Sequence, residues 1–380
     1  MTGKGPCNMS TISNQSSTQV EGKQRLKNGI PQAQDIMCQG FYNRNKEISA
    51  MLLSVLAGYN SVFIGRPGVA KSAIANRILS ALPKPGFTLQ FSAYTEIEEL
   101  FGPLNLTSFR ENDRRIRMTH GYLPSARYAV LDEIFKAQSS TLNALLLILN
   151  ERRYVEEGES KPTSLEAVIA SSNERPDEEA TALADRMCMY INVKPTSDNE
   201  LKDFMTSILS NPNGTKPLDN PIITMSMIAK INKQIDDTIK LNMSKIIEII
   251  QAFNSSIKQL LNNEALYREA KLSDRAMYQC ARLLATSCVM REDNRVLDTD
   301  AWFFEYMARS ESYIDTYQAA SAEVCQLYSS LGLLKESLMS KGEASIRRNI
   351  VKVQECFDRL PHHWRSELNS LINAQLANMT

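Results

Sequence analysis

A glycine-bearing loop at residues 65–72, GRPGVAKS, carries the side chains of this 380-residue chain that are best suited to chemistry. It follows the apolar run SVFI at 61–64, which predicts a buried strand, and it leads into a predicted helix over 71–82. Strand, loop, lysine-serine and helix form the arrangement in which backbone N–H groups surround the phosphates of a nucleotide. The loop therefore predicts binding of ATP or GTP.

Individual positions of this loop have distinct expected roles. Gly65 and Gly68 would let the backbone approach phosphate oxygens with no Cβ in the way. Lys71 would place its charge on the β- and γ-phosphates, and the Ser72 hydroxyl would ligate Mg²⁺. The remaining cofactor-binding candidates are Pro67, Val69 and Ala70, of which Ala70 stands where the usual pattern has glycine and where a small residue should still fit.

A second motif, which carries two acidic residues, completes the predicted site. The apolar stretch YAVL at 128–131 predicts a strand that ends in Asp132 and Glu133. Ligands of open α/β sheets bind at the carboxyl ends of the strands, so Asp132 would hold Mg²⁺ and Glu133 would act as general base toward water. Asn173 ends the next apolar strand, where its amide could bind the γ-phosphate. Alone, each of these could be a polar turn; beside the loop they predict hydrolysis.

Two arginines could act on the transferred phosphate. Arg186, in LADRM, precedes the last predicted strand and would act as an arginine finger on a neighbouring subunit's ATP. Arg275, in SDR, opens a helix and would sense the γ-phosphate within its own subunit. The alternative for each is an ordinary surface ion pair.

The surrounding pattern predicts the elements that must position these residues. Short apolar strands at 61–65, 87–92, 128–131, 167–170 and 189–193 alternate with helices, which is typical of a parallel sheet covered on both faces. After Pro195 the pattern becomes helical. We therefore expect four regions: a disordered tail at 1–35, an αβα nucleotide-binding domain at 36–196, a helical lid at 197–308, and a helical extension at 309–380.

Composition excludes several classes of protein. Lysine plus arginine equal aspartate plus glutamate at 43 each, which argues against bulk electrostatic binding to nucleic acid or a membrane. The seven cysteines show no metal-binding spacing and indicate reduced thiols. We expect no signal peptide, and the sequence contains no apolar run of membrane-spanning length. We expect a cytoplasmic protein.

Taken together, these motifs resemble those of AAA+ ATPases of the MoxR group, and more closely its RavA-like (regulatory-ATPase-variant) branch. The likeness covers about residues 38–308. The segments that carry it, besides the loop, VLDEIFKA, Asn173 and LADRM, are GFYNR at 40–44, LFGPL at 100–104, GYLP at 121–124, LNERRY at 149–154 and SDR at 273–275.

The resemblance implies a hexameric ring that hydrolyses ATP to ADP with Mg²⁺ and remodels a protein client in a chaperone-like way. It implies an insertion at 101–124 and a hairpin at 153–163, both facing the ring's pore. Asn173, Arg186 and Arg275 would be its sensor 1, arginine finger and sensor 2. The partner-binding insert of RavA-like proteins is absent from this sequence, and a von Willebrand factor A protein is a possible partner.

Two other functions stay open at this point. A nucleic-acid motor or loader could use similar hairpins, although the zero net charge weighs against it. A nucleotide-gated scaffold with slow turnover would present its helical C-terminus to a partner, although the full set of catalytic residues weighs against pure scaffolding.

Overall fold

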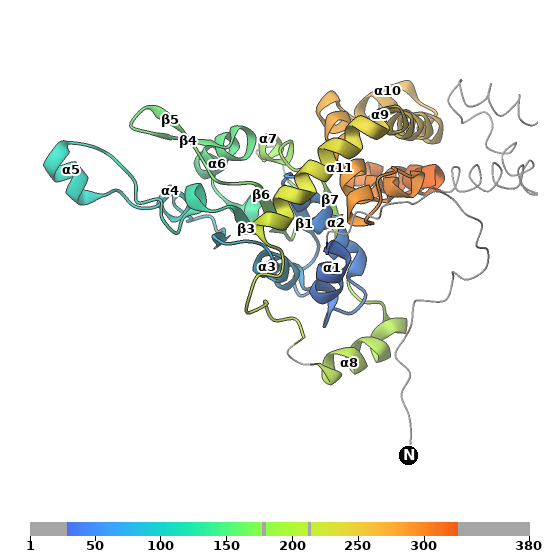
Figure 1. The fold of residues 1–380 in the computed structure, drawn as a ribbon, viewed down its shortest axis with the longest axis horizontal. Helices are drawn as coiled ribbons and strands as arrows, with labels where there is room; N and C mark the ends of the chain where they lie inside the picture. Colours follow the sequence, from blue (N-terminus) through green and yellow to red (C-terminus); the bar gives the residue numbers. More distant parts are fainter. Residues whose placement is uncertain (1–28, 177–179, 212–213, 326–380) are drawn as a thin grey trace, which may run out of the picture.

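The computed structural model describes residues 29–176, 180–211 and 214–325, and it is built around a five-stranded parallel sheet (Figure 1). The strands lie in the order β2 (Gly86–Gln90), β3 (Tyr128–Asp132), β6 (Ala167–Ser172), β1 (Ser61–Ile64) and β7 (Tyr190–Asn192). All five were predicted, with ends that differ by at most two residues. The predicted α/β class with a parallel-sheet core is therefore confirmed.

Register aligns the carboxyl ends of the three central strands. Leu131 of β3 lies opposite Ala170 of β6, and Ser172 of β6 lies opposite Ile64 of β1. The residues that follow these strands consequently meet at one edge of the sheet, as open α/β folds require of a binding site. These three strands are buried on both faces because their side chains alternate between two hydrophobic cores.

Helices cover each face of the sheet. One core lies under α1 (Ile30–Cys38), α2 (Asn45–Leu56) and α3 (Lys71–Ala81). The other lies under α4 (Ile97–Phe101), α6 (Ser139–Glu151) and α7 (Thr181–Ala184). Short 3₁₀ turns, η1 (Leu123–Ser125) and η2 (Ile134–Lys136), flank β3.

Two extensions project from the same side of the core, as Figure 1 shows. The first is the expected insertion, in which α5 (Leu106–Asn112) stands at the tip of two long connections that meet in a bridge between Leu104 and Arg117. The second is the expected hairpin, with β4 (Arg153–Glu156) antiparallel to β5 (Glu159–Pro162).

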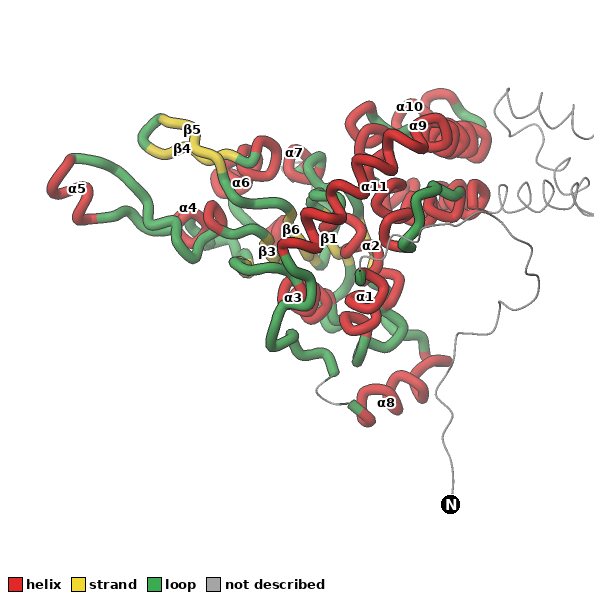
Figure 2. Tube along the Cα trace, in the orientation of Figure 1, coloured by secondary structure: helices red, strands yellow, loops and turns green. Residues whose placement is uncertain are grey.

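A helical bundle forms the other end of the molecule (Figure 2). It contains α9 (Met225–Leu261), α10 (Glu264–Ala270), α11 (Asp274–Met290), and the 3₁₀ segments η4 (Asp298–Met307) and η5 (Glu311–Tyr313). Helix α9 bends at Asn242, whose φ of −118° is not helical and whose side chain bonds Asn294 and Val296. This bundle includes most of the expected helical lid.

The expected domain limits need three corrections. The tail cannot extend to residue 35, because α1 begins at Ile30, whose side chain is fully buried. The lid does not begin at 197, because the chain first forms η3 (Asp198–Glu200) and α8 (Leu201–Ser210) and then returns to α3, where Ile222 and Ile223 bond the Ala81 carbonyl. Residue 309 does not open a separate region, because Tyr317 and Val324 are buried in the same core as the lid.

Two predictions fall on other parts of the chain. Residues 1–28 of the expected tail and 326–380 of the expected extension lie outside the described residues. Within 29–176, 180–211 and 214–325, no helix combines the length and the apolar character that crossing a bilayer demands.

Candidate nucleotide site

The candidate site forms where β1, β3 and β6 end. Lys71, the first residue of α3, turns its side chain back over loop 65–72 and donates to the carbonyl oxygens of Gly65 at 2.6 Å and Arg66 at 3.1 Å. Its third bond, of 2.8 Å, goes to Oδ1 of Asn173. The predicted phosphate lysine and the predicted sensor asparagine therefore touch, although 102 positions separate them in sequence.

Burial changes the acid–base character of this lysine. Lys71 is 6% exposed. Desolvation lowers its pKa, and the charges of Glu133 and Asp132 act in the opposite sense. A desolvated ammonium held by three oxygen acceptors is a strong point charge for a phosphate, because little water screens it.

A hydroxyl and a carboxylate meet beside it. Ser72 Oγ donates to Asp132 Oδ2 at 2.7 Å, and the Ser171 hydroxyl donates to the other oxygen, Oδ1. Oxygen ligands of this kind are those that Mg²⁺ prefers, and it keeps several waters in such sites. The residues present thus fit the magnesium that the sequence predicts, with Ser72 and Asp132 as its protein contacts.

Glu133 is fixed by an unusual backbone. It takes a left-handed conformation, with φ of 55°, and its N–H donates to Asp132 Oδ1 at 3.1 Å. Its carboxylate Oε2 accepts from the backbone N–H of Asn173 at 3.4 Å and pairs with Lys136 Nζ at 3.3 Å. A conformation that is uncommon outside glycine is held here at the predicted general base, as strained positions at functional sites often are.

At two positions of loop 65–72, the structure gives a reason for the residue type that the sequence did not suggest. A Cβ on Gly65 would lie 2.4 Å from the carbonyl oxygen of Val193, so close packing against the chain after β7 already requires glycine there. Ala70 has φ of 71°, the conformation for which the usual glycine is suited. Alanine fits this position, as predicted, but it occupies a left-handed backbone.

The two arginines lie together and apart from Lys71's contacts. Arg275, at the start of α11, donates to the backbone carbonyl of Asp185 at 3.4 Å, directly beside Arg186. The Asp185 carboxylate pairs with Arg309. Arg186 is half-buried, and its Nε has no hydrogen-bond partner among the described residues. The structure thus brings the predicted sensor 2 next to the residue that precedes the predicted finger.

Sequence reasoning missed three contributors to these contacts: Ser171, Lys136 and Asp185. Lys136 and Asp185 stood within the noted motifs VLDEIFKA and LADRM, and Ser171 lies just before Asn173, but nothing in their spacing distinguished them from ordinary strand-end and turn residues. The contact of Ser171 depends on which strands are neighbours, because β6 lies beside β3 only in three dimensions, and that of Lys136 depends on the conformation of the turn after β3.

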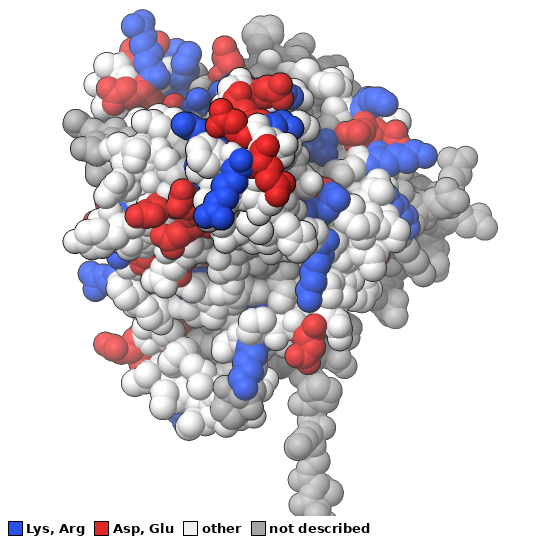
Figure 3. Space-filling model, turned by 90° about the vertical axis from the view of Figure 1, so that its left-hand side faces the viewer, with Lys and Arg blue, Asp and Glu red and all other residues white. Residues whose placement is uncertain are grey.

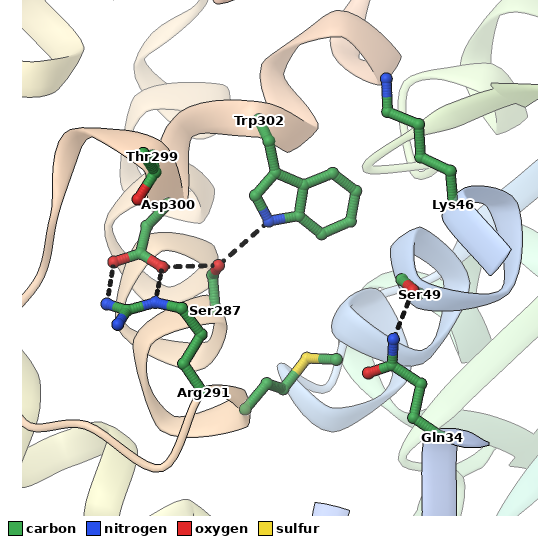
Figure 4. Close-up of a pocket in the computed structure, with 9 residues that line it drawn as sticks. Gln34, Lys46, Ser49, Ser287, Arg291, Thr299, Asp300 and Trp302 are labelled. Atoms are coloured by element: carbon green, nitrogen blue, oxygen red, sulfur yellow. Dashed lines mark hydrogen bonds and ion pairs between the residues drawn. The ribbon is translucent and has the colours of Figure 1, made fainter. Parts of the chain in front are cut away.

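A cavity of about 400 Å³ lies elsewhere, between α1–α2 and the lid (Figure 4). Its most buried polar group is Asp300, which accepts two bonds from Arg291, at 2.9 and 2.7 Å, and one from Ser287 at 2.9 Å. Trp302 Nε1 donates to the Ser287 hydroxyl at 3.1 Å. All four residues belong to the lid and satisfy one another, so we interpret this network as one that holds η4 against α11.

Comparison with known proteins identifies the family. Residues 28–233 match a family model described as the MoxR domain in MoxR–vWA–beta-propeller ternary systems. The chain belongs to the MoxR family. With its parallel-sheet core, it is a MoxR-type AAA+ ATPase in fold.

Curated relatives of this MoxR protein match only part of their own length. Uncharacterized protein MJ0812 of Methanocaldococcus jannaschii is 37% identical over 54% of this chain and 56% of that protein. Uncharacterized protein MJ0079 of the same organism is 45% identical over 38% of this chain and 39% of that protein. Structural protein ORF618 of Acidianus two-tailed virus is 26% identical over 58% of this chain and 39% of that protein.

A solved structure supports the fold. A protein of Cytophaga hutchinsonii assigned as an ATPase superposes with a TM-score of 0.56 at 14% identity, covering 78% of this chain and 92% of that one. At this identity the likeness concerns architecture alone.

Proposed function

We propose that this MoxR protein hydrolyses ATP at the site formed by loop 65–72, β3 and β6. The observation that carries the proposal is the convergence of Lys71 and Asn173 at 2.8 Å with Ser72 and Asp132 at 2.7 Å. A lysine, an amide, a hydroxyl and a carboxylate are brought to one edge of the sheet by three different strands. That is the donor set that phosphoryl transfer uses for positioning and charge stabilisation.

Each residue then has a role in the reaction. Lys71 and the loop's backbone N–H groups bind the phosphates, and the start of α3 adds its partial positive charge. Ser72 and Asp132 would hold Mg²⁺, which neutralises charge on the phosphate oxygens. Glu133 accepts the proton of the attacking water, and Asn173 orients that water or the γ-phosphate.

The arginine pair completes the site in a neighbouring copy. Arg275 bonds the backbone carbonyl of Asp185, the residue before Arg186, so the two arginines lie close together. We assign both to the neighbour's ATP, in place of the expected action of Arg275 inside its own subunit. Stabilisation of transition-state charge by such a finger is worth several orders of magnitude in rate.

The decisive experiment removes the general base without changing its shape. In Glu133→Gln, ATP affinity should change little while turnover falls by roughly 10²-fold or more, because only the proton acceptor is lost. Single-turnover hydrolysis and equilibrium nucleotide binding measure the two effects separately. Unchanged hydrolysis would contradict the proposal. Lys136→Gln is the control, because it removes the ion-pair partner of Glu133 and leaves the carboxylate.

At the level of biology, the proposal is a hexameric ring that remodels a protein client. The family description, which names MoxR–vWA systems, supports a von Willebrand factor A protein as partner. The RavA-like placement and the inward-facing insertion and hairpin stay predictions. A pull-down with the Glu133→Gln variant tests the proposed protein client, because that variant should hold the ATP state and its client together.

The charge distribution bears on the nucleic-acid alternative. Figure 3 views the side from which α5 and the hairpin project, and it shows basic and acidic side chains intermingled. Arg114 pairs there with Glu157, and Lys161 with Glu156. Basic side chains that are paired in this way make a poor track for a phosphate backbone. We therefore favour a protein client, and steep salt-dependent DNA or RNA binding would reverse that choice.

A further inference from the structure

We propose that Arg175 is a positioning residue that sets where Arg186 is presented to the ATP of a neighbouring subunit. The observation behind this inference is a series of side-chain contacts that begins two residues after Asn173 and ends on the two residues that precede Arg186. The inference rests on the proposed function, because it requires Arg186 to act as a finger on another subunit's nucleotide.

Arg175 fastens the end of β6 to the lid. Its side chain is half-buried, and Nη1 donates to the backbone carbonyl of Ala308 at 3.2 Å and to that of Arg309 at 2.6 Å. Hydrogen bonds from a charged donor are roughly twice as strong as those between neutral groups. The lid segment between η4 and η5 is therefore held close to the strand end that carries Asn173.

The lid side of this contact reaches the finger directly. The side chain of Arg309 pairs through Nη1 with the carboxylate of Asp185, the residue that precedes Arg186. The backbone carbonyl of Asp185 accepts from Arg275 at 3.4 Å. A shift of the Arg309 backbone would therefore change the position of Asp185, and with it that of the finger.

A second route to the finger runs through β7. Nη2 of Arg175 donates to Oδ1 of Asn192 at 3.2 Å, and the guanidinium lies over the ring of Tyr190, 5.5 Å from its centroid. The hydroxyl of Tyr190, which is buried, donates to the backbone carbonyl of Ala184 at 2.7 Å. One guanidinium thus holds, through two different partners, the two residues that directly precede Arg186.

Arg186 depends on these neighbours for its position. Its Nε is buried and has no hydrogen-bond partner within the described ranges of the chain. The preceding helix, α7, has only four residues, and an isolated helix of that length is not stable in water. Misplacement of a catalytic group by about 1 Å can cost about 10²-fold in rate. Loss of Arg175 should therefore impair the finger while leaving Arg186 itself unchanged.

The first test separates hydrolysis from nucleotide binding. Arg175→Gln should hydrolyse ATP roughly 10²-fold more slowly, because the finger is misplaced. Its equilibrium affinity for ATP should change little, since Lys71 and its contacts remain. Arg309→Gln should show the same separation to a smaller extent, and its exposed side chain makes a folding defect easy to avoid. Arg295→Gln, which removes an exposed lid arginine outside these contacts, is the control and should match the unmodified protein.

The second test shows in which subunit the defect acts. In the reference mixture of Lys71→Ala with Arg186→Ala, an intact loop meets an intact finger and hydrolysis should return. Arg175→Gln should also recover hydrolysis when it is mixed with Lys71→Ala, because its own loop then receives a well-placed finger. Mixed with Arg186→Ala, it should be no more active than its parts, because neither protein supplies such a finger.

Three outcomes of these mixtures would overturn the inference. Recovery of Arg175→Gln with Arg186→Ala would place the defect in the subunit's own site. Recovery with neither partner would show a general loss of structure. Hydrolysis by Arg175→Gln equal to that of Arg295→Gln would show that the contacts do not matter. Failure of the reference mixture would overturn the finger and this inference with it, whereas turnover lost in Glu133→Gln would still support the hydrolytic site.

Discussion

Ala70 and Glu133 hold left-handed backbone conformations within the candidate site, with φ of 71° and 55°. For residues with a Cβ this conformation costs roughly 1–2 kcal/mol each, so the surrounding contacts must maintain it. In Glu133 the strain places the carboxylate against the Asn173 N–H. In Ala70 it forms the turn from which α3 begins.

Substitutions at position 70 should separate conformational strain from nucleotide chemistry. Ala70→Gly should change stability by less than about 1 kcal/mol, because relief of left-handed strain offsets the extra freedom of glycine in the unfolded chain. Ala70→Val should lose more than about 1 kcal/mol, because a β-branched residue is a genuine outlier there. Urea unfolding measures both. Ala73→Val, two residues into α3, is the control and should lose less.

Asp298 predicts a pH dependence of stability. Burial raises its pKa from 3.8 to about 6 even though Lys245 Nζ lies 2.7 Å from Oδ1. A carboxyl group with a raised pKa in the fold stabilises it fully below pH 3.8, and that contribution is lost as pH rises through 6.

The variant Asp298→Asn cannot titrate at this position. Relative to it, the unmodified protein should lose on the order of 2–3 kcal/mol of unfolding free energy between about pH 4 and pH 6, and nothing further above that. Urea unfolding of both proteins across pH 4–8 measures the difference. Parallel curves would show that Asp298 does not titrate in this range.

At the scale of elements, the insertion and the hairpin are bound to each other. Arg114, just after α5, donates to Glu157 in the hairpin turn through Nε at 3.1 Å and Nη2 at 2.9 Å. At the base of the insertion, the backbone N–H of Arg117 donates to the side chain of Glu156, the last residue of β4, at 2.6 Å. The hairpin directly precedes β6, and the insertion precedes β3. These contacts therefore join the two segments that lead into two of the three strands of the candidate site.

Breaking this link should loosen both extensions at once. In Arg114→Glu or Glu157→Arg, amide hydrogen exchange across residues 153–162 and 105–117 should accelerate, because like charges then face each other. The double exchange, Arg114→Glu with Glu157→Arg, should restore slow exchange. Arg110→Glu, an exposed position within α5, should leave the hairpin unchanged. Acceleration confined to one extension would contradict the coupling.

The elements that position the site were predictable, and their mutual packing was not. Continuous apolar runs such as residues 128–131 indicate buried strands, and glycine with lysine-serine marks where a helix begins. The path from 197 to 223 was assigned to the lid because helical periodicity reveals α8 without revealing that the chain returns to Ala81. The contacts of Ser171, Lys136 and Asp185 depend on strand order and loop geometry, which local patterns do not encode.

At the scale of the whole molecule, the proposed ring predicts complementation between defective subunits. Arg186→Ala should bind ATP nearly as well as the unmodified protein and hydrolyse it roughly 10³-fold more slowly, because only transition-state charge is affected. Lys71→Ala should lose ATP binding. Mixing the two should recover measurable hydrolysis, since an intact loop can then meet an intact Arg186. A mixture no more active than its parts would place Arg186 in its own subunit's site or outside catalysis.

The close approach of Gly65 to Val193 has a mechanical consequence. Val193 follows β7 and opens the connection that carries α8, while Gly65 opens the phosphate loop, and a Cβ on Gly65 would lie only 2.4 Å from the Val193 carbonyl oxygen. A displacement of a few tenths of an ångström in the loop is therefore passed directly to the connection. Binding of a nucleotide to the loop would therefore shift the backbone of the connection that carries α8, without any movement of the long helices of the lid.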